Sequence, residues 1–249
     1  MIKSDPPRTQ EGAPIRVLHP LFICLIIITL ISCSFEDSNT SNQVIELPTP
    51  VNLETILEQV GNSMSNLQSF EFYLYHRNGD GSPLEGLILT EAIGLVEKPS
   101  NVSVEADLLL GNLLVKSGII YIGDNSFILN PLTKTWETLD SEIGLLNFFS
   151  PETGIESILA SFSNPVLIME NDESLTIKGI VPATSLSSIV GETTNNNVTA
   201  EITILKKTHL MIKAKISGRL TNLDSEGLVR FIEISKFNQS FDIAVPPES

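Results

Sequence analysis

The chain has 249 residues, of which 30 are acidic and 15 are basic, so its formal net charge at pH 7 is −15. A protein that binds nucleic acid needs a basic surface that displaces counterions, and this charge balance argues against such a partner. Apolar residues make up 42% of the chain, which is enough to build a core and excludes a disordered acidic tail.

The most apolar stretch is LFICLIIITLISCSF, residues 21–35. Its strongly apolar part ends at Ile31 and has 11 residues, whereas a helix needs about 20 residues to cross a bilayer. A short apolar segment behind three basic residues is typical of a signal peptide. We therefore predict that residues 1–32 are a signal peptide that the mature protein lacks.

The end of this stretch, Leu30-Ile31-Ser32-Cys33, matches the bacterial lipobox, in which an aliphatic residue and then a small residue precede a cysteine. In proteins with this motif the nucleophilic thiol receives a diacylglyceryl group, the peptide is cut before the cysteine and the new amine is usually acylated. We predict that Cys33 carries acyl chains such as palmitate. These would anchor the protein to the extracytoplasmic face of the bacterial cell membrane. Cys24, inside the apolar run, is expected to be only a small hydrophobic residue.

Residues 34–50 read SFEDSNTSNQVIELPTP, a polar segment that ends in Pro-Thr-Pro. This composition is typical of a flexible tether, so residues 33–50 are assigned to the lipidated cysteine and its linker. Residues 51–249 are predicted to form a single domain. It begins with a helix capped by Asn52, because apolar residues recur at helical spacing from Leu53 to Leu67.

Strand patterns follow this helix. Phe70, Phe72 and Leu74 alternate with polar or aromatic residues before the turn RNGDGSP. Later, Val104, Leu108 and Leu110 share one face of a strand, and Gly111-Asn112 supplies a hairpin turn. The further strands expected in this half are residues 87–96, 102–110, 113–122 and 127–130. Successive hairpins of this kind predict an antiparallel sheet with one apolar face and one polar face.

A second helix is predicted over residues 151–162, with Ser150-Pro151 as its start and Pro165 as its stop. Its Ile155, Leu159 and Phe162 fall on one apolar stripe. Beyond it we expect strands over residues 166–170, 175–181, 198–205, 210–220 and 228–237, and a short helix over 185–190. About nine strands with inserted helices indicate an α+β fold, in which helices cover the apolar face of one curved antiparallel sheet.

Residues with catalytic chemistry are scarce. The sequence contains no nucleophile elbow, phosphate-binding loop, dinucleotide fingerprint or zinc-protease motif. His76 ends a predicted strand and His209 lies in a Lys-Lys-Thr-His turn, so both are expected to be solvated surface residues. Both cysteines lie near the N-terminus, which leaves the domain without a disulfide or thiolate metal site. We therefore expect no enzyme activity, no metal and no cofactor.

Several segments of the chain follow one another in an order that resembles a known protein family. After the helix that leads into LQSFEF come EAIGLVEKP, IIYIGDNSFILNPLTKTW, FFSPETGIESILASFSN and finally FNQSFDIAVPP. Behind a lipidated cysteine, this order resembles the LppX/LprA/LprF/LprG lipoproteins of mycobacteria and other bacteria, over about residues 51–247. The resemblance implies a strongly curved antiparallel half-barrel, similar to the lipoprotein carriers of the Lol system, with helices that enclose a hydrophobic cavity. It also implies binding of a lipid or acylated glycolipid and its carriage across or towards the outer cell envelope.

The apolar faces of the predicted elements supply candidate residues for this cavity. These candidates are Phe70, Phe72, Leu74, Val104, Leu108, Leu110, Phe148, Phe149, Ile155, Leu159 and Phe162. The helix over residues 151–162 would form part of a gate, and the two adjacent phenylalanines its mouth. A 16-carbon chain in water is disfavoured by about 12 kcal/mol, so a lipid tail must be enclosed to cross an aqueous envelope.

Two hypotheses therefore stand. In the first, a membrane-anchored monomer binds lipid and exchanges it with an envelope transporter, without covalent chemistry. In the second, the same apolar residues form an ordinary packed core, and the domain is a non-enzymatic module that binds a protein partner at the cell envelope.

Overall fold

The computed structural model describes residues 52–84, 86–138 and 154–247. The predicted signal peptide, Cys33, the tether and the pair Phe148 and Phe149 lie outside the described residues. Residues 50–249 form one compact unit. No helix among the described residues is long and apolar enough to cross a membrane.

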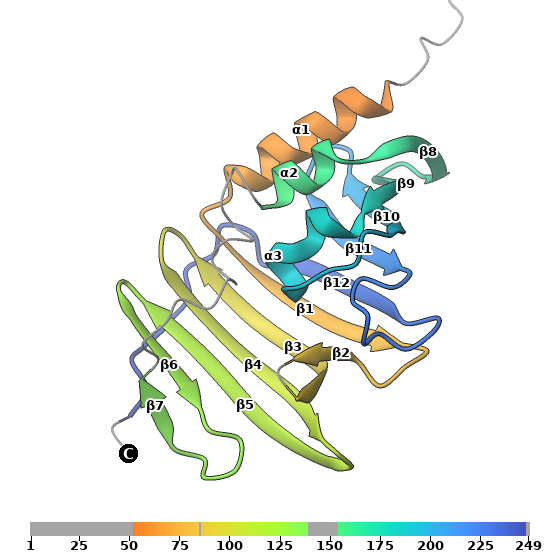
Figure 1. Cartoon of the computed structure of the whole chain (residues 1–249). Helices are drawn as coiled ribbons and strands as arrows, with labels where there is room; N and C mark the ends of the chain where they lie inside the picture. The colour runs from red at the N-terminus through yellow and green to blue at the C-terminus, as the bar shows by residue number, and fades with distance from the viewer. Residues whose placement is uncertain (1–51, 85, 139–153, 248–249) are drawn as a thin grey trace, which may run out of the picture. The chain divides into compact units, whose positions relative to one another are not determined.

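The described fold contains twelve strands and a few short helical elements (Figure 1). The helices are α1 (Leu53–Ser65), α2 (Ile155–Ala160) and α3 (Ser187–Val190), and the 3₁₀ turn η2 (Ala183–Leu186) precedes α3. The strands are β1 (Ser69–Arg77), β2 (Ser82–Leu84), β3 (Leu87–Glu97), β4 (Asn101–Leu110), β5 (Leu113–Ile122), β6 (Asn125–Leu129), β7 (Trp136–Thr138), β8 (Ser163–Glu170), β9 (Ser174–Pro182), β10 (Asn197–Leu205), β11 (Met211–Ser217) and β12 (Val229–Ser235).

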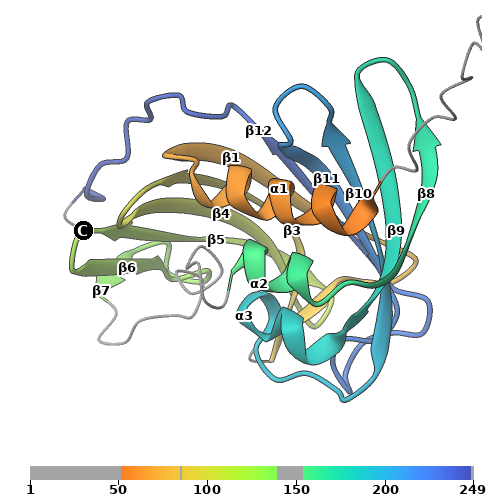
Figure 2. The same ribbon diagram turned by 90° about the horizontal axis from the view of Figure 1, so that it is seen from above.

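All strands belong to one antiparallel sheet with the order β7-β6-β5-β4-β3-β1-β12-β11-β10-β9-β8, and β2 pairs with β3 beside this path. The sheet is not closed, because β7 and β8 form its two edges. It bends around α1 and α2, and all the helices lie on the inner side of this bend (Figure 2). The predicted α+β class with a large antiparallel sheet is confirmed, whereas β2 and β7 are strands that the sequence patterns did not reveal.

The first helix has the predicted start. The side chain of Asn52 accepts a hydrogen bond of 3.0 Å from the backbone N–H of Thr55, which satisfies one of the free donors of the first turn. Leu57, Val60 and Met64 are buried on one face of α1, whereas Glu54 and Glu58 are exposed on the other. The amphipathic pattern therefore determines both the helix and the face that packs on the sheet.

The centre of the sheet joins the two ends of the domain. β1 pairs with β12 in a register that places Leu74 opposite Ile232, although the two residues are far apart in the sequence. Both side chains are buried in the core cluster that also holds the inner faces of β3, β4, β9, β10 and β11. This long-range pairing turns two series of hairpins into one sheet with a single core.

The second helix is shorter than predicted. α2 begins after Gly154 and ends at Ala160, and residues 151–153 lie outside the described residues. Pro165 does not separate the helix from the next strand, as predicted, but lies within β8. A proline lacks the N–H that a central strand needs, and it is tolerated here because β8 is an edge strand whose register shifts between Ser163 and Val166.

The outer face of the sheet is polar and aromatic. Tyr75 stacks between Tyr73 and Phe231, with ring centroids 5.1 Å and 4.9 Å apart. The Tyr73 hydroxyl donates a 2.6 Å hydrogen bond to Glu91, and this bond raises the pKa of Tyr73 to about 12. Lys213 forms an ion pair with Glu233 on the same face. The predicted division into a polar face and an apolar face is confirmed.

Candidate functional site

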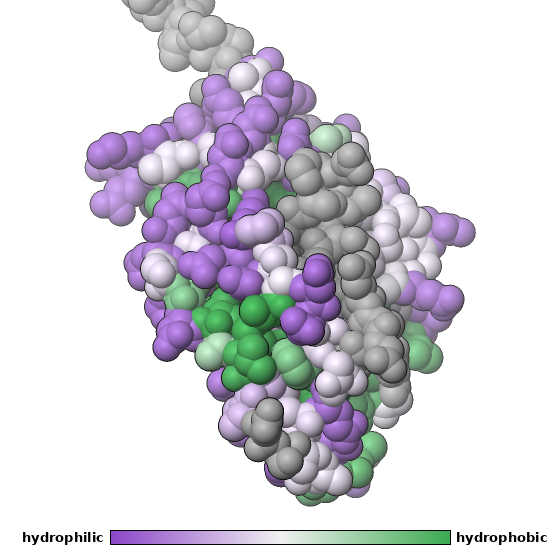
Figure 3. All heavy atoms as spheres, turned by 90° about the vertical axis from the view of Figure 1, so that its left-hand side faces the viewer, coloured by the Kyte–Doolittle hydropathy of each residue, from purple (hydrophilic) through white to green (hydrophobic). Residues whose placement is uncertain are grey.

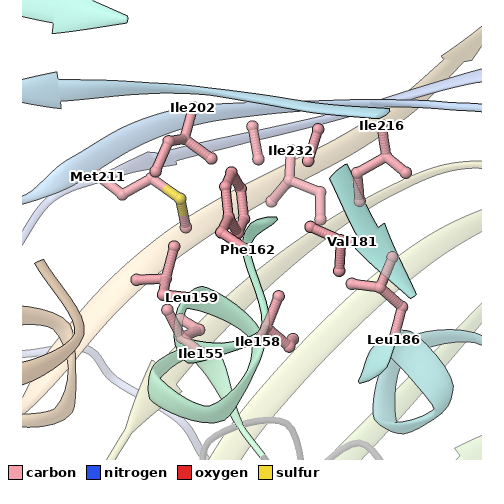
Figure 4. Close-up of a pocket in the computed structure, with 12 residues that line it drawn as sticks. Ile155, Ile158, Leu159, Phe162, Val181, Leu186, Ile202, Met211, Ile216 and Ile232 are labelled. Carbon is pink, nitrogen blue, oxygen red and sulfur yellow. The ribbon is translucent and has the colours of Figure 1, made fainter. Parts of the chain in front are cut away.

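An apolar pocket lies between α2, the η2 turn and the inner face of β9 to β12 (Figure 4). Its volume is about 40 Å³. The residues that line it share an apolar side chain and come from six elements and the segments that adjoin them. They are Ile155, Ile158, Leu159, Phe162, Val181, Leu186, Ala200, Ile202, Met211, Ala214, Ile216 and Ile232.

Two periodicities bring these side chains together. Ile155, Ile158 and Leu159 are three and four residues apart, so they lie on one face of α2 and are all buried. Ala200 and Ile202 are two residues apart on β10 and therefore point to the same face of the sheet. Ala214 and Ile216 on β11 have the same spacing, and Met211 and Ile232 complete the apolar floor that α2 covers.

Three small residues lie in the site around Phe162. A Cβ atom built on Gly179 would lie 2.6 Å from Cδ1 of Phe162, so the phenylalanine ring occupies the space that any larger residue would fill. Ala200 and Ala214 on the floor are similarly short and buried. Ala200 and Ala214 line the pocket, whereas the space beside Gly179 is filled by the Phe162 ring.

Three of the candidate cavity residues, Ile155, Leu159 and Phe162, line this pocket. Four others are buried or partly buried elsewhere. Phe70, Leu74 and Val104 belong to the same core cluster. Phe72 packs against this cluster, and its ring occupies the space that the missing side chain of Gly94 leaves.

The remaining candidates lie in other places. Leu108 is buried but outside the core cluster, whereas Leu110 is 39% exposed at the end of β4 and contacts none of the pocket. Leu110 shares the apolar face of its strand, but the strand ends beyond the helices that would cover it. Phe148 and Phe149 lie outside the described residues.

The residues on the floor of the pocket were not among the cavity candidates from the sequence. Ala200, Ile202, Ala214, Ile216 and Ile232 all follow the alternation that predicted their strands. That alternation shows which residues face inwards. It does not show which part of a twelve-stranded sheet lies beneath a given helix.

The chemistry of the pocket is restricted to apolar contact. None of its lining residues is charged, titratable or able to form a side-chain hydrogen bond. Within the described ranges, no three His, Cys, Asp or Glu side chains gather as a metal site would require. The arrangement can hold an apolar group, but its volume is well below the about 300–1,000 Å³ that is usual for sites of small-molecule ligands.

A polar network lies apart from this pocket. His76 is half-buried, and its Nδ1 lies 2.7 Å from the carbonyl oxygen of Thr90. Its Nε2 lies 2.7 Å from Oγ of Ser82, which also accepts a hydrogen bond of 2.8 Å from Nε of Arg230. The prediction that His76 is a solvated surface residue is therefore wrong, because its strand pairs beside β12 and brings it to a buried arginine.

Comparisons with known proteins agree with this fold. The model of the LppX_LprAFG lipoprotein family matches residues 52–243. The chain resembles the crystal structure of LprF from Mycobacterium bovis with a TM-score of 0.59 and 12% identity, covering 78% of this chain and 96% of that one. It resembles Mycobacterium tuberculosis lipoprotein LppX with a TM-score of 0.55 and 18% identity, covering 77% and 98%. The sequence has no significant match among curated proteins.

Proposed function

The chain belongs to the LppX_LprAFG lipoprotein family, and we propose that it binds a lipid or acylated glycolipid between α2 and the inner face of the sheet. The observation that carries this proposal is the lining of the pocket, in which every side chain is apolar. The protein would act as a non-enzymatic carrier, anchored through acyl chains on Cys33 at the extracytoplasmic face of the membrane.

A lipid tail requires more room than the 40 Å³ of the pocket, so α2 has to move when the tail enters. Separating α2 from the sheet exposes Ile155, Ile158 and Leu159, at about 1.5–3 kcal/mol each. A buried 16-carbon chain contributes about 12 kcal/mol, which exceeds the roughly 5–9 kcal/mol for these three side chains. We infer that the tail takes the place of α2 on the sheet and that α2 closes the empty site.

The cavity candidates from the sequence fit this proposal to different degrees. Phe70, Phe72, Leu74, Val104 and Leu108 would contact a tail only if the site opens further along β1 and β4. Leu110, Phe148 and Phe149 would contribute at its mouth. A carrier of this kind would receive or release its lipid at an envelope transporter and carry it towards the outer envelope as a monomer.

Mass spectrometry of organic extracts tests the proposal. The purified full chain should release a noncovalent lipid in about equimolar amount, whereas acyl groups on Cys33 stay with the protein. Ala214→Leu fills the floor of the pocket and should remove most of the lipid. The control Ala92→Leu enlarges an equally buried alanine outside the pocket and should keep the lipid. A folded wild-type protein without any extractable lipid would contradict the proposal.

One observation favours the second hypothesis, a domain with an ordinary core that binds a protein partner. The pocket is small enough for the structure to be stable with nothing in it. This alternative predicts that one protein co-purifies in stoichiometric amount and that Ala214→Leu leaves its binding unchanged.

A further inference from the structure

Five leucines are exposed at one end of the sheet, and together they are called the leucine rim. They are Leu84 (46% exposed), Leu110 (39%), Leu113 (57%), Leu114 (56%) and Leu132 (65%). Single exposed leucines are common on protein surfaces, but a group at one end of a sheet marks a surface with a partner.

The register of the strands places these residues together. Leu84 pairs with Leu87 in the turn between β2 and β3, and β3 then runs antiparallel to β4, with Ile88 opposite Leu109. Leu110 pairs with Leu113 at the tip of the β4–β5 hairpin. The turns of the β2–β3 and β4–β5 hairpins therefore end at the same edge of the fold.

The β6–β7 turn, which holds Leu132, joins this group. Nζ of Lys134 donates a 2.9 Å hydrogen bond to the carbonyl oxygen of Lys116, which is three residues from Leu113, so the turn lies beside the half of the β4–β5 hairpin that includes its tip. Both hairpins end at the lower end of the domain (Figure 1), where a few hydrophobic residues show among more polar ones on the face seen in Figure 3.

The tip of the β4–β5 hairpin projects beyond the core. Leu113 and Leu114 are consecutive in a strand, so their side chains point to opposite faces of the sheet. Both are more than half exposed, which means that neither face is covered at this point. An apolar wedge with two open faces suits a fluid apolar phase, because a flat protein surface could cover only one of them.

The charges around the rim are mixed, and Asp107, together with the nearby Glu105 and Glu91, raises the pKa of Lys116. Lys116 forms a 2.7 Å ion pair with Asp107, and Lys134 and Glu137 lie on either side of the start of β7. Glu85, which follows Leu84, lies outside the described residues. These carboxylates and the net charge of −15 for the chain disfavour anionic headgroups, so the rim suits headgroups that carry no net charge.

We propose that the leucine rim inserts into the surface of the bilayer in which Cys33 is anchored. The tether of residues 34–50 can span at most about 60 Å, at about 3.3–3.6 Å per residue. From the end of the tether the chain runs through α1, about 20 Å long, and β1, about 31 Å long, to the end of the sheet that carries the rim. A nearly extended tether therefore lets the rim reach that bilayer. The proposal rests on the predicted acylation of Cys33 but not on the lipid cargo.

Vesicle flotation without the anchor tests the rim alone. The chain from residue 34 to residue 249 is suitable, because residues 50–249 form one compact unit and the core cluster begins at Leu57. It should bind vesicles of phosphatidylcholine, with an affinity that salt leaves unchanged, since the contact is apolar. Leu113→Ser/Leu114→Ser should weaken binding at least about tenfold.

The matched control removes two apolar residues of similar exposure from the edge strand β8. Val166→Ser/Met169→Ser, at positions that are 56% and 65% exposed, should leave binding unchanged. Thermal unfolding should confirm that both variants fold. Equal loss in both variants, or no binding by the wild type, would overturn the proposal. So would a wild-type dimer that Leu113→Ser/Leu114→Ser converts to a monomer, because a second copy would then cover the rim.

Discussion

Arg230 and Asp224 are the two charged residues that the described part of the structure buries. Nη2 of Arg230 lies 2.7 Å from Oδ1 of Asp224, and Oδ2 of Asp224 accepts a 2.7 Å hydrogen bond from the backbone N–H of Leu220. Nη1 of Arg230 is buried without a hydrogen-bond partner. Each charge is therefore stable in the core only because the other is present.

Removal of the carboxylate should have a large effect. In Asp224→Ala, Arg230 keeps its charge in the core without a counterion, and we expect a loss of about 3–5 kcal/mol in the free energy of unfolding, measured with urea. The control Glu233→Ala breaks the exposed ion pair with Lys213 and should lose at most about 1 kcal/mol. Equal losses in the two variants would show that the buried ion pair contributes no more to stability than the exposed pair.

His76 should make stability depend on pH. Burial lowers the pKa of His76, the Thr90 carbonyl raises it, and the nearby Arg230 charge lowers it, with a net lowering. The unfolded chain then binds a proton at His76 below about pH 6.5, before the folded protein does. The contribution of His76 to the free energy of unfolding should therefore be fully present above this pH. It should be lost as the pH drops through the pKa of His76 in the folded state.

Urea unfolding at several pH values between about 7 and 5 measures this effect. His76→Gln should flatten the dependence, whereas His209→Gln, which leaves His76 in place, should keep it. An unchanged slope in His76→Gln would assign the dependence to other groups.

At the scale of elements, two glycines decide where aromatic rings can lie. Gly94 on β3 faces the ring of Phe72, and Gly179 on β9 faces the ring of Phe162. A ring that lies over a strand glycine fills the space of the missing side chain and fixes the position of its own element. Phe162 directly follows α2, so Gly179 also sets how closely α2 approaches the floor of the pocket.

Gly179→Ala should disturb this contact. Its Cβ would lie 2.6 Å from Phe162 Cδ1, and displacement of the ring should destabilise the fold by about 1–3 kcal/mol in urea unfolding. Phe162→Leu in the same chain should recover part of this loss, because the smaller side chain leaves room for the methyl group. Additive losses in the double variant would contradict a direct clash.

Local patterns were sufficient for some elements and not for others. Asn52 and the apolar spacing after it predicted α1 correctly, since capping and periodicity depend on neighbouring residues. The same reasoning extended the second helix to Phe162, because the apolar stripe continues beyond Ala160, where α2 ends. Its predicted start at Pro151 lies outside the described residues. Pro165 could not be placed in a strand from sequence, since an edge position is a property of the whole sheet.

At the scale of the molecule, the N-terminal motif and the domain are independent features. The lipobox lies outside the described residues, so the fold neither requires nor tests it. Together they would form a lipid-binding domain on a tether of 17 residues, which keeps the domain close to a bilayer while leaving it free to turn.

Metabolic labelling with an alkyne analogue of palmitate tests the anchor. The wild-type chain should become labelled, and Cys33→Ser should abolish the label, since its hydroxyl is a much weaker nucleophile than a thiolate. Cys24→Ser is the matched control and should keep the label, because Cys24 lies in the predicted signal peptide, which the mature protein would lack. Labelling that depends on Cys24, or that persists in Cys33→Ser, would contradict the prediction.

Most helices and strands, although not β2 and β7, and the apolar and polar faces could be read from neighbouring residues, and the family resemblance from the order of segments along the chain. Helix caps, alternation and turns act over a few positions, so they are written directly in the chain. Only the tertiary structure decided which inward residues meet at the pocket, why Leu110 remains exposed and how His76 comes to lie beside Arg230. These outcomes depend on the pairing of β1 with β12 and on the bend of the sheet, and both join residues that the sequence keeps far apart.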